Sequence, residues 1–175
     1  MKKIISLFQR NYDGDRLVRN EITPGAGWVL NGEGVATQKL DGTCCMVRGG
    51  KLFKRFDVKN GKQPPFGFEP AQQPDNVTGH WPGWIPVGDG PEDRWHMEAL
   101  NGLSEPPPNG TYELVGPMVN KNPDHFEKHC FMQHGNVVFS DTPRDYDGLK
   151  AWLNERDIEG IVFHHEDGRM VKIKL

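Results

Sequence analysis

Short apolar segments separated by glycine-containing turns recur along this chain, and the pattern predicts a protein built mainly of β-strands. The segments that read as strands are 35–39, 44–47, 52–56, 111–116, 136–140, 161–164 and 170–175. Turns are expected at Asp41-Gly42 and Gly49-Gly50, and the last two strands should form a hairpin around 166–168. Strands dominate and helices lie at the flanks, so the predicted fold class is α+β with antiparallel sheets.

One helix is expected in the C-terminal third of the chain. Thr142 reads as its N-cap, Pro143 as its first helical residue, and Asp145 as an acid near its amino end. The residues predicted to share its apolar face are Leu149, Trp152 and Leu153. The helix should end before Gly160.

Residues 57–94 depart from this pattern, because prolines, glycines and the tryptophans Trp81 and Trp84 interrupt it. Proline lacks a backbone donor, so such a stretch is unsuited to a helix or to a central strand. We expect a long, partly ordered insertion at about 57–95 that its tryptophans pack down, within a single domain spanning 1–175.

Composition narrows the class of protein. Hydrophobic residues make up 35% and charged residues 26% of the 175 residues, as in soluble globular domains, and no segment has the length of a membrane span. The net charge of −3 gives no global attraction to nucleic acid, so any such contact needs a local basic patch. Three cysteines are few and odd in number, which favours reduced thiols and a cytoplasmic setting.

The segment most informative about function is Lys39-Leu40-Asp41-Gly42, because matching blocks follow it in order. They are Tyr112 to Gly116, Glu159 to Val162, and Lys172-Ile173-Lys174, each a short apolar strand that carries one or two charges. A lone K-x-D-G occurs often by chance. The ordered set resembles the layout of the covalent nucleotidyltransferases, which implies a lysine nucleophile that attacks the α-phosphate of a nucleoside triphosphate.

Such a lysine must lose its proton, although a free lysine has a pKa of about 10.4. Lys172 and Lys174 alternate on one strand, so both point to the same face. Placed beside Lys39, they would favour its neutral amine and bind phosphate oxygens in the transition state. Glu113 and Glu159 would supply carboxylates for a divalent cation, for which magnesium suits a triphosphate best, with manganese as a substitute.

A basic segment follows the first block. Six basic residues and one acid lie from Arg48 to Lys62, which makes this the candidate patch for a nucleic-acid phosphate backbone, with Lys51 and Lys54 as contacts. Arg55 differs from these, since a guanidinium suits a nucleotide or a 5′-phosphate.

Two alternative chemistries are weaker. A zinc site would need more than His125, His129, Cys130 and His134, whose spacing lacks a C-x-x-C pair, so loop histidines are expected instead. Cys44-Cys45 directly follows the nucleophile block, but a packing role in a strand is favoured over thiol chemistry.

These blocks resemble the motifs of the covalent nucleotidyltransferases, which include DNA and RNA ligases and capping enzymes. More narrowly, the chain resembles the vertebrate-type ATP-dependent 5′-to-3′ RNA ligase family, RNA ligase 1. The strings that carry the narrow resemblance are 33–45, 82–87, 113–116, 120–123, 134–135 and 159–164. Lys-Leu-Asp-Gly-Thr-Cys-Cys is unusually specific among them.

The resemblance implies a role for each matching residue. Lys39 would be the adenylylated nucleophile, Glu113 and Glu159 the two motif acids, and Lys172 and Lys174 the final motif. The residues implied to contact the nucleotide are Gln38, Asp41, Arg55, Glu113, Phe139 and Glu159, with Gln38 near the adenine edge and Phe139 stacked on the base. ATP and magnesium are the implied cofactors, and RNA ends are the implied substrate.

The chain stops one residue after Lys174, which leaves no room for the OB-fold that capping enzymes and most DNA ligases carry. A minimal RNA ligase is therefore the leading interpretation. The alternatives are a related enzyme with another acceptor, such as a DNA nick or a GTP-using capping reaction, and a nucleotide-binding module without turnover.

Overall fold

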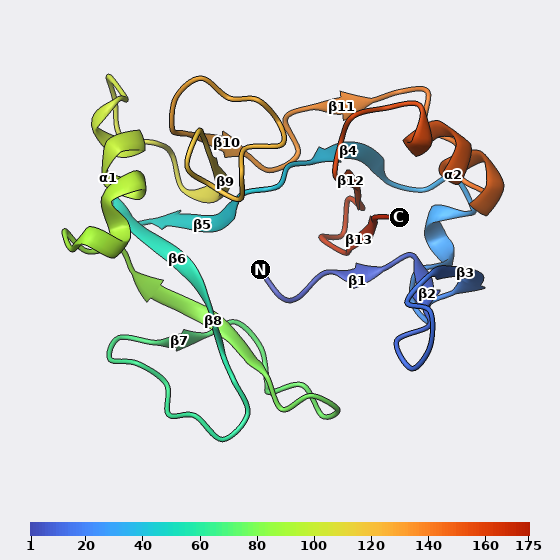
Figure 1. Cartoon of the computed structure of the whole chain (residues 1–175), viewed down its shortest axis with the longest axis horizontal. Coiled ribbons are helices and arrows are strands. Elements are labelled where there is room, and N and C mark those ends of the chain that lie inside the picture. Colours follow the sequence, from blue (N-terminus) through green and yellow to red (C-terminus); the bar gives the residue numbers. More distant parts are fainter. The chain divides into compact units, whose positions relative to one another are not determined.

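The computed structural model describes all residues, 1–175, and is a mixed α+β structure with few helices and several antiparallel sheets. The chain divides into two compact units (Figure 1). Unit 1 consists of residues 1–3 and 41–134, and unit 2 of residues 4–40 and 135–175. The chain therefore leaves unit 2 inside the Lys39 block, between Leu40 and Asp41, and returns to it after His134.

Unit 1 is built on a six-stranded antiparallel sheet in the order β10-β9-β5-β6-β8-β7. Its elements in chain order are β5 (Thr43–Arg48), β6 (Lys51–Val58), β7 (Glu69–Pro70), β8 (Trp81–Pro86), the 3₁₀ turn η2 (Pro91–Asp93), α1 (Arg94–Asn101), β9 (Gly110–Val115) and β10 (Cys130–Gln133). Alternate residues of β5 and β9 point to one face, where Cys45, Tyr112 and Leu114 form a core with Ala99 of α1. The other face of these strands is thus left for polar side chains such as Glu113.

The prediction that residues 57–94 hold no central strand is wrong. β8 lies between β6 and β7 in the sheet, and Figure 1 shows it running along β6. The prolines of β8 are tolerated because their backbone nitrogens and carbonyls point toward the short β7. On that side the Pro82 carbonyl oxygen accepts a hydrogen bond from the Ala71 N–H. On the β6 side, the Val87 N–H donates to the Leu52 carbonyl oxygen. The prolines therefore remove no N–H donor from the backbone hydrogen bonds between β6 and β8. Helix α1, which begins at Arg94, was not predicted.

The tryptophans of this stretch do pack it down, as expected. Trp84 is buried, and the Trp81 indole N–H donates to the Gln72 carbonyl oxygen at 2.8 Å.

Unit 2 contains a five-stranded sheet in the order β1-β13-β12-β4-β11 and a two-stranded sheet, β2-β3. Its elements are β1 (Ile5–Ser6), β2 (Phe8–Arg10), β3 (Val18–Ile22), the 3₁₀ turn η1 (Gly27–Val29), β4 (Val35–Lys39), β11 (Val138–Phe139), α2 (Tyr146–Asn154), β12 (Gly160–His164) and β13 (Met170–Ile173). The strands at 35–39 and 161–164 and the C-terminal hairpin are confirmed. The N-terminal strands were not predicted, and β1 pairs with β13 in parallel.

Helix α2 begins three residues later than predicted. Asp145, not Thr142, is its N-cap, and the Asp145 carboxylate accepts a hydrogen bond from the Gly148 N–H at 2.8 Å. The predicted apolar face is confirmed, since Leu149, Trp152 and Leu153 are all buried in the core of unit 2.

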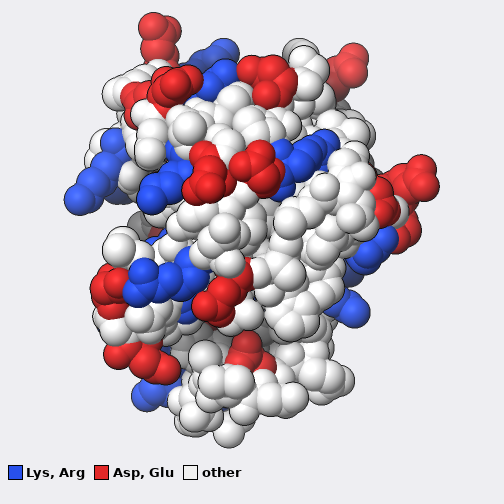
Figure 2. Space-filling model, turned by 90° about the vertical axis from the view of Figure 1, so that its right-hand side faces the viewer, with Lys and Arg blue, Asp and Glu red and all other residues white.

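Two further features concern the charged side chains at the surface and the length of the helices. On the side where α2 lies, basic and acidic side chains are interspersed, with no extended area of one sign (Figure 2). None of the helices reaches the length and hydropathy that a bilayer crossing requires.

Candidate active site

Lys39 stands at the end of β4, and the register of unit 2 fixes its neighbours. Lys39 pairs with Gly160 of β12, while Ile161 of β12 pairs with Ile173 of β13. Residues two apart on a strand share a face, so Lys39, Lys172 and Lys174 all belong to the face opposite the buried Ile161 and Ile173. The predicted shared face of the lysines is thus present.

Glu159 joins two of these lysines. The Lys39 ammonium donates to its Oε2, and the Lys174 ammonium donates to its Oε1 at 2.8 Å. The side chains of Lys39 and Glu159 are 24% and 11% exposed, so most of this contact is shielded from solvent, whereas Lys174 is 52% exposed. One carboxylate therefore positions the candidate nucleophile and a second cation beside it.

Two opposing effects set the charge of Glu159. Burial raises the pKa of its carboxyl, but the hydrogen bonds and charges of Lys174 and Lys39 outweigh burial and hold the pKa below its ordinary value. Glu159 is therefore ionised at neutral pH.

Gly160 makes room for this arrangement. A Cβ at this position would lie 2.2 Å from the Ile173 carbonyl oxygen, so no other residue fits between β4 and β13. Since Gly160 is the cross-strand partner of Lys39, the space beside the Lys39 side chain contains no opposing side chain.

Of the other candidate residues of unit 2, Lys172 shares the sheet face of Lys39, whereas Gln38 and Phe139 do not. Gln38 pairs with Ile161, so its side chain belongs to the sheet face opposite to that of Lys39. Phe139 packs edge-to-face against Trp152 of α2, with ring centroids 5.0 Å apart, and is partly buried. Lys172 is half-buried and pairs with Val162.

In unit 1, a loop after β9 anchors Asp41 and Gly42. The Asn120 amide donates to the Asp41 carboxylate at 3.0 Å and to the Gly42 carbonyl oxygen at 2.7 Å, and the Asp124 carboxylate accepts from the Asp41 N–H at 3.0 Å. A Cβ on Gly42 would lie 2.2 Å from the Leu114 carbonyl oxygen. The glycine of the block is thus required by its close approach to β9.

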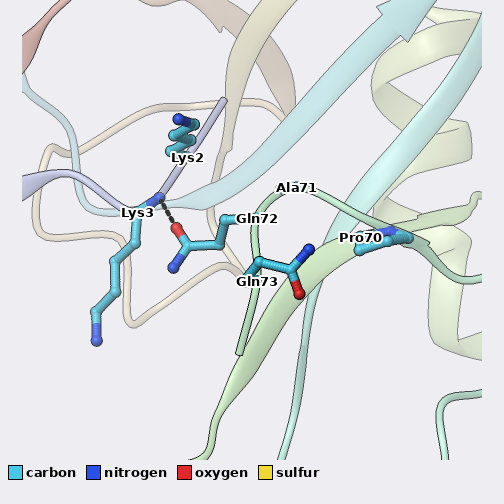
Figure 3. Close-up of a pocket in the computed structure, with 6 residues that line it drawn as sticks. All are labelled: Lys2, Lys3, Pro70, Ala71, Gln72 and Gln73. Atoms are coloured by element: carbon cyan, nitrogen blue, oxygen red, sulfur yellow. Dashed lines mark hydrogen bonds between the residues drawn. The ribbon is translucent and has the colours of Figure 1, made fainter. Parts of the chain in front are cut away.

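Arg55 of β6 is held from two sides within unit 1. Its guanidinium donates to the Met1 carbonyl oxygen at 2.7 Å and lies over the Trp84 ring, 4.8 Å from the centroid. The Lys3 N–H donates to the Gln72 side-chain oxygen at 2.7 Å and fixes the same terminal segment (Figure 3). A shallow pocket of about 590 Å³ lies there, beside Lys2 and Gln73.

Glu113 lies on the polar face of β9 and contacts His134. The imidazole Nε2 and the Glu113 carboxylate are 2.8 Å apart, and the side chains are 23% and 14% exposed. Cys44 completes this group, because its sulfur and the ligating atoms of Glu113 and His134 all lie within 4.8 Å of one another.

The two lysines assigned to RNA differ in their surroundings. Lys51 is exposed. The Lys54 ammonium forms an ion pair with Asp93, whose side chain is only 3% exposed and also accepts from the Gly88 N–H at 2.8 Å. Arg48 likewise pairs with Glu69 at 2.6 Å, so several charges of the basic segment are neutralised locally.

Sequence reasoning missed the residues that support the site. Asn120 and Asp124 hold the first block, and His134 binds Glu113, yet these residues come from loops without periodicity. The one sequence signal for Asn120 and His134 is that 120–123 and 134–135 belong to the strings on which the family resemblance rests, whereas Asp124 lies outside those strings.

Comparison with known proteins agrees with the family that the sequence motifs resemble. A sequence model of the RNA ligase 1 family matches residues 100–175, a stretch that contains Glu113, Glu159, Lys172 and Lys174 but not Lys39. RNA ligase 1 of Mus musculus is 28% identical over 213 aligned positions, and RNA ligase 1 of Danio rerio is 26% identical over 211. Each alignment covers 79% of this chain and 65% of the relative, so the chain spans about two thirds of the length of these proteins.

Proposed function

We propose that this chain, which matches the RNA ligase 1 family model over residues 100–175, is a member of that family and an ATP-dependent RNA ligase that works through a covalent lysyl-AMP on Lys39. The observation that carries the proposal is the contact of the Lys39 amine with the partly buried Glu159, which Lys174 shares. We also assign the fold to the adenylyltransferase domains of the covalent nucleotidyltransferases.

The reaction proceeds in three transfers. The neutral amine of Lys39 attacks the α-phosphorus of ATP, the bond to the β-phosphate breaks, and pyrophosphate leaves. A 5′-phosphate oxygen of RNA then attacks the lysyl-AMP phosphorus and releases the amine. Finally a 3′-hydroxyl attacks the activated 5′-phosphate, the new phosphodiester forms, and AMP leaves.

Glu159 and the final lysines have separate parts in the first transfer. The Glu159 carboxylate accepts a hydrogen bond from the Lys39 amine and so orients it toward the phosphate. Lys174 and Lys172, on the same sheet face, place positive charge where phosphate oxygens gain negative charge in the transition state. Because Glu159 holds both Lys39 and Lys174, loss of its charge would disturb both groups.

The ionised carboxylate of Glu159 is a hard oxygen donor and fits magnesium, with manganese as a substitute. Bound there, magnesium would neutralise charge on the triphosphate and on the departing pyrophosphate. Glu113 offers a second carboxylate, although its immediate neighbours are the softer donors Cys44 and His134.

The remaining nucleotide contacts are proposals that rest on the family resemblance. Arg55 would contact ribose or phosphate, with Asp41 near the nucleotide and Phe139 against the base. Gln38 would approach the adenine edge through its backbone, because its side chain belongs to the sheet face opposite to that of Lys39. For Phe139 this needs a release from its packing on Trp152. Alanine variants of Phe139 and Arg55 would reveal such roles as a raised KM for ATP.

The decisive experiment is self-adenylylation with purified protein. Incubation with ATP and magnesium should add the mass of one AMP per chain in an acid-labile bond, and peptide mapping should locate it on Lys39. The Lys39→Ala variant should gain nothing, whereas Lys150→Ala, an exposed lysine of α2, should be labelled like the wild type.

Each alternative predicts a different result. Labelling from GTP but not from ATP would indicate a capping-type enzyme. ATP binding without any covalent label would indicate a nucleotide-binding module. Label that persists in Lys39→Ala would contradict the proposed nucleophile.

A further inference from the structure

Three metal-ligating side chains meet on the polar face of the unit 1 sheet. Cys44 of β5 is the direct cross-strand partner of Glu113 of β9. His134 follows β10 directly and is two residues after Met132, the partner of Glu113 on that strand. Directly paired residues, and residues two apart on a strand, point to the same face, so neighbouring strands bring the three side chains together.

The spacing of the donor atoms is close to that of a metal site. The Cys44 sulfur, a Glu113 oxygen and an imidazole nitrogen of His134 all lie within 4.8 Å of one another. Zinc bonds of about 2.0–2.3 Å in tetrahedral geometry place neighbouring donors about 3.2–3.8 Å apart. Small side-chain rotations on a fixed sheet would therefore bring all three donors onto one ion.

The kind of donors selects the kind of ion. A thiolate, an imidazole and a carboxylate form a mixed set that suits zinc and similar borderline cations, whereas magnesium prefers oxygen ligands alone. The His134 Nδ1 is buried and has no hydrogen-bond partner, so protein atoms alone do not satisfy the polar groups of this cluster. The three side chains are half-buried rather than sealed, and three protein donors leave a fourth position for solvent.

We propose that Cys44, Glu113 and His134 form a binding site for a zinc-class divalent cation and that occupation of this site inhibits the enzyme. The reason for inhibition is that Glu113 cannot hold such an ion and also serve the nucleotide. Binding follows from the cluster itself, whereas inhibition rests on the function proposed above.

Binding is tested without ATP. Protein freed of any histidine tag and of metal is titrated with zinc in competition with a chromophoric chelator, and separately with cobalt(II), whose thiolate complexes show a charge-transfer band. We expect one ion per chain and a thiolate band for the wild type. Cys44→Ser should bind zinc at least about tenfold more weakly and lose the band.

The chain offers a matched control, Cys130→Ser, because Cys130 is a half-buried cysteine on the same sheet but outside the cluster. This variant should bind like the wild type. In wild-type protein, zinc should slow alkylation of Cys44 but not of Cys130, which tests the site even if a variant folds poorly. Equal zinc affinity in wild type and a folded Cys44→Ser, or unprotected Cys44 alkylation, would overturn the site.

Inhibition is tested by self-adenylylation in excess magnesium, each protein being compared with its own zinc-free rate. Zinc should slow the wild type and Cys130→Ser severalfold more than Cys44→Ser. Bound zinc with an unchanged rate would overturn the inhibitory role. Absence of adenylylation without zinc would instead overturn the proposed function, and the binding result would still decide the site.

Discussion

At the scale of single residues, Glu159 is the centre of the unit 2 site. Its carboxylate receives Lys39 on one oxygen and Lys174 on the other. Lys39 is more shielded from solvent than Lys174, so the two ion pairs with Glu159 differ in how much they contribute to stability. Shielded contacts are screened less by solvent than exposed ones, and an exposed pair contributes little to stability.

We therefore expect Lys174→Met to affect catalysis and not folding. Loss of a cation that stabilises phosphate charge should slow self-adenylylation by about 100-fold or more. The free energy of unfolding should change by less than about 1 kcal/mol, because Lys174 is half-exposed. Single-turnover labelling and urea unfolding measure the two effects, with Lys150→Met as the control. A wild-type rate would mean that Lys174 is only part of a solvated strand.

The lowered pKa of Glu159 predicts a pH dependence of stability. A carboxyl whose folded-state pKa is below its unfolded value adds stability above the unfolded value and loses it as pH falls through the folded one. The contribution should thus be complete at pH 7, begin to decline near the ordinary value of 4.5, and be lost as pH falls through the lower folded-state pKa. Urea unfolding of wild type and Glu159→Gln should show a difference at pH 7 that shrinks below pH 4.5. A difference that grows in acid would contradict this sign.

The charged residues of the blocks were predictable from sequence, whereas their partners were not. Glu159 and Lys174 stood out because the blocks that contain them follow the Lys39 block in the matching order. The shared face of Lys172 and Lys174 follows from the period-two alternation of a strand. The contacts of Asn120 with Asp41 and of His134 with Glu113 depend on loop paths that no local pattern encodes.

At the scale of elements, strand pairing explains both the successes and the failures of prediction. The hairpin of β12 and β13 is local, so alternation and a turn predict it. The place of β8 inside the sheet depends instead on the side to which its prolines point, and that is settled only when β6 and β7 pair with it. Proline content alone therefore cannot distinguish a strand that pairs on both sides from a segment that lies outside the sheet.

The close approach of β9 to the first block makes Gly42 a test of this architecture. In Gly42→Ala the new Cβ would meet the Leu114 carbonyl oxygen, so β9 or the block must move. We expect a loss of about 1–3 kcal/mol in stability and a slower adenylylation. Gly27→Ala is the matched control, because nothing lies within 4 Å of a Cβ there. Thermal unfolding and labelling of both variants measure the effects, and a stable, fully active Gly42→Ala would refute the requirement.

At the scale of the whole molecule, the chain distributes its motif residues over two compact units. Lys39, Glu159 and the final lysines belong to unit 2, and Arg55 and Glu113 to unit 1. Because the chain changes unit inside the Lys39 block, no composition shift marks the boundary, and length alone predicts a single domain.

The basic segment of unit 1 gives the last prediction, which concerns the acceptor. We expect joining of 5′-phosphate RNA to 3′-hydroxyl RNA in preference to sealing of an all-DNA nick. Lys51→Glu should weaken RNA binding and flatten its salt dependence, because each lost phosphate contact releases about one counterion fewer. Lys54→Glu is a poorer probe, since it would place a second acid against the buried Asp93 and destabilise the fold.

The matched control for this experiment is Lys150→Glu, which changes the net charge equally at an exposed position of α2 in unit 2. RNA and DNA substrates should be compared over a salt series with all three proteins, and self-adenylylation measured alongside. Lys51→Glu should leave self-adenylylation nearly unchanged, because Lys51 has no proposed role at the nucleotide. Faster sealing of DNA than of RNA would contradict the acceptor assignment. An equal loss of RNA binding in Lys51→Glu and Lys150→Glu would show that net charge, and not this segment, attracts RNA.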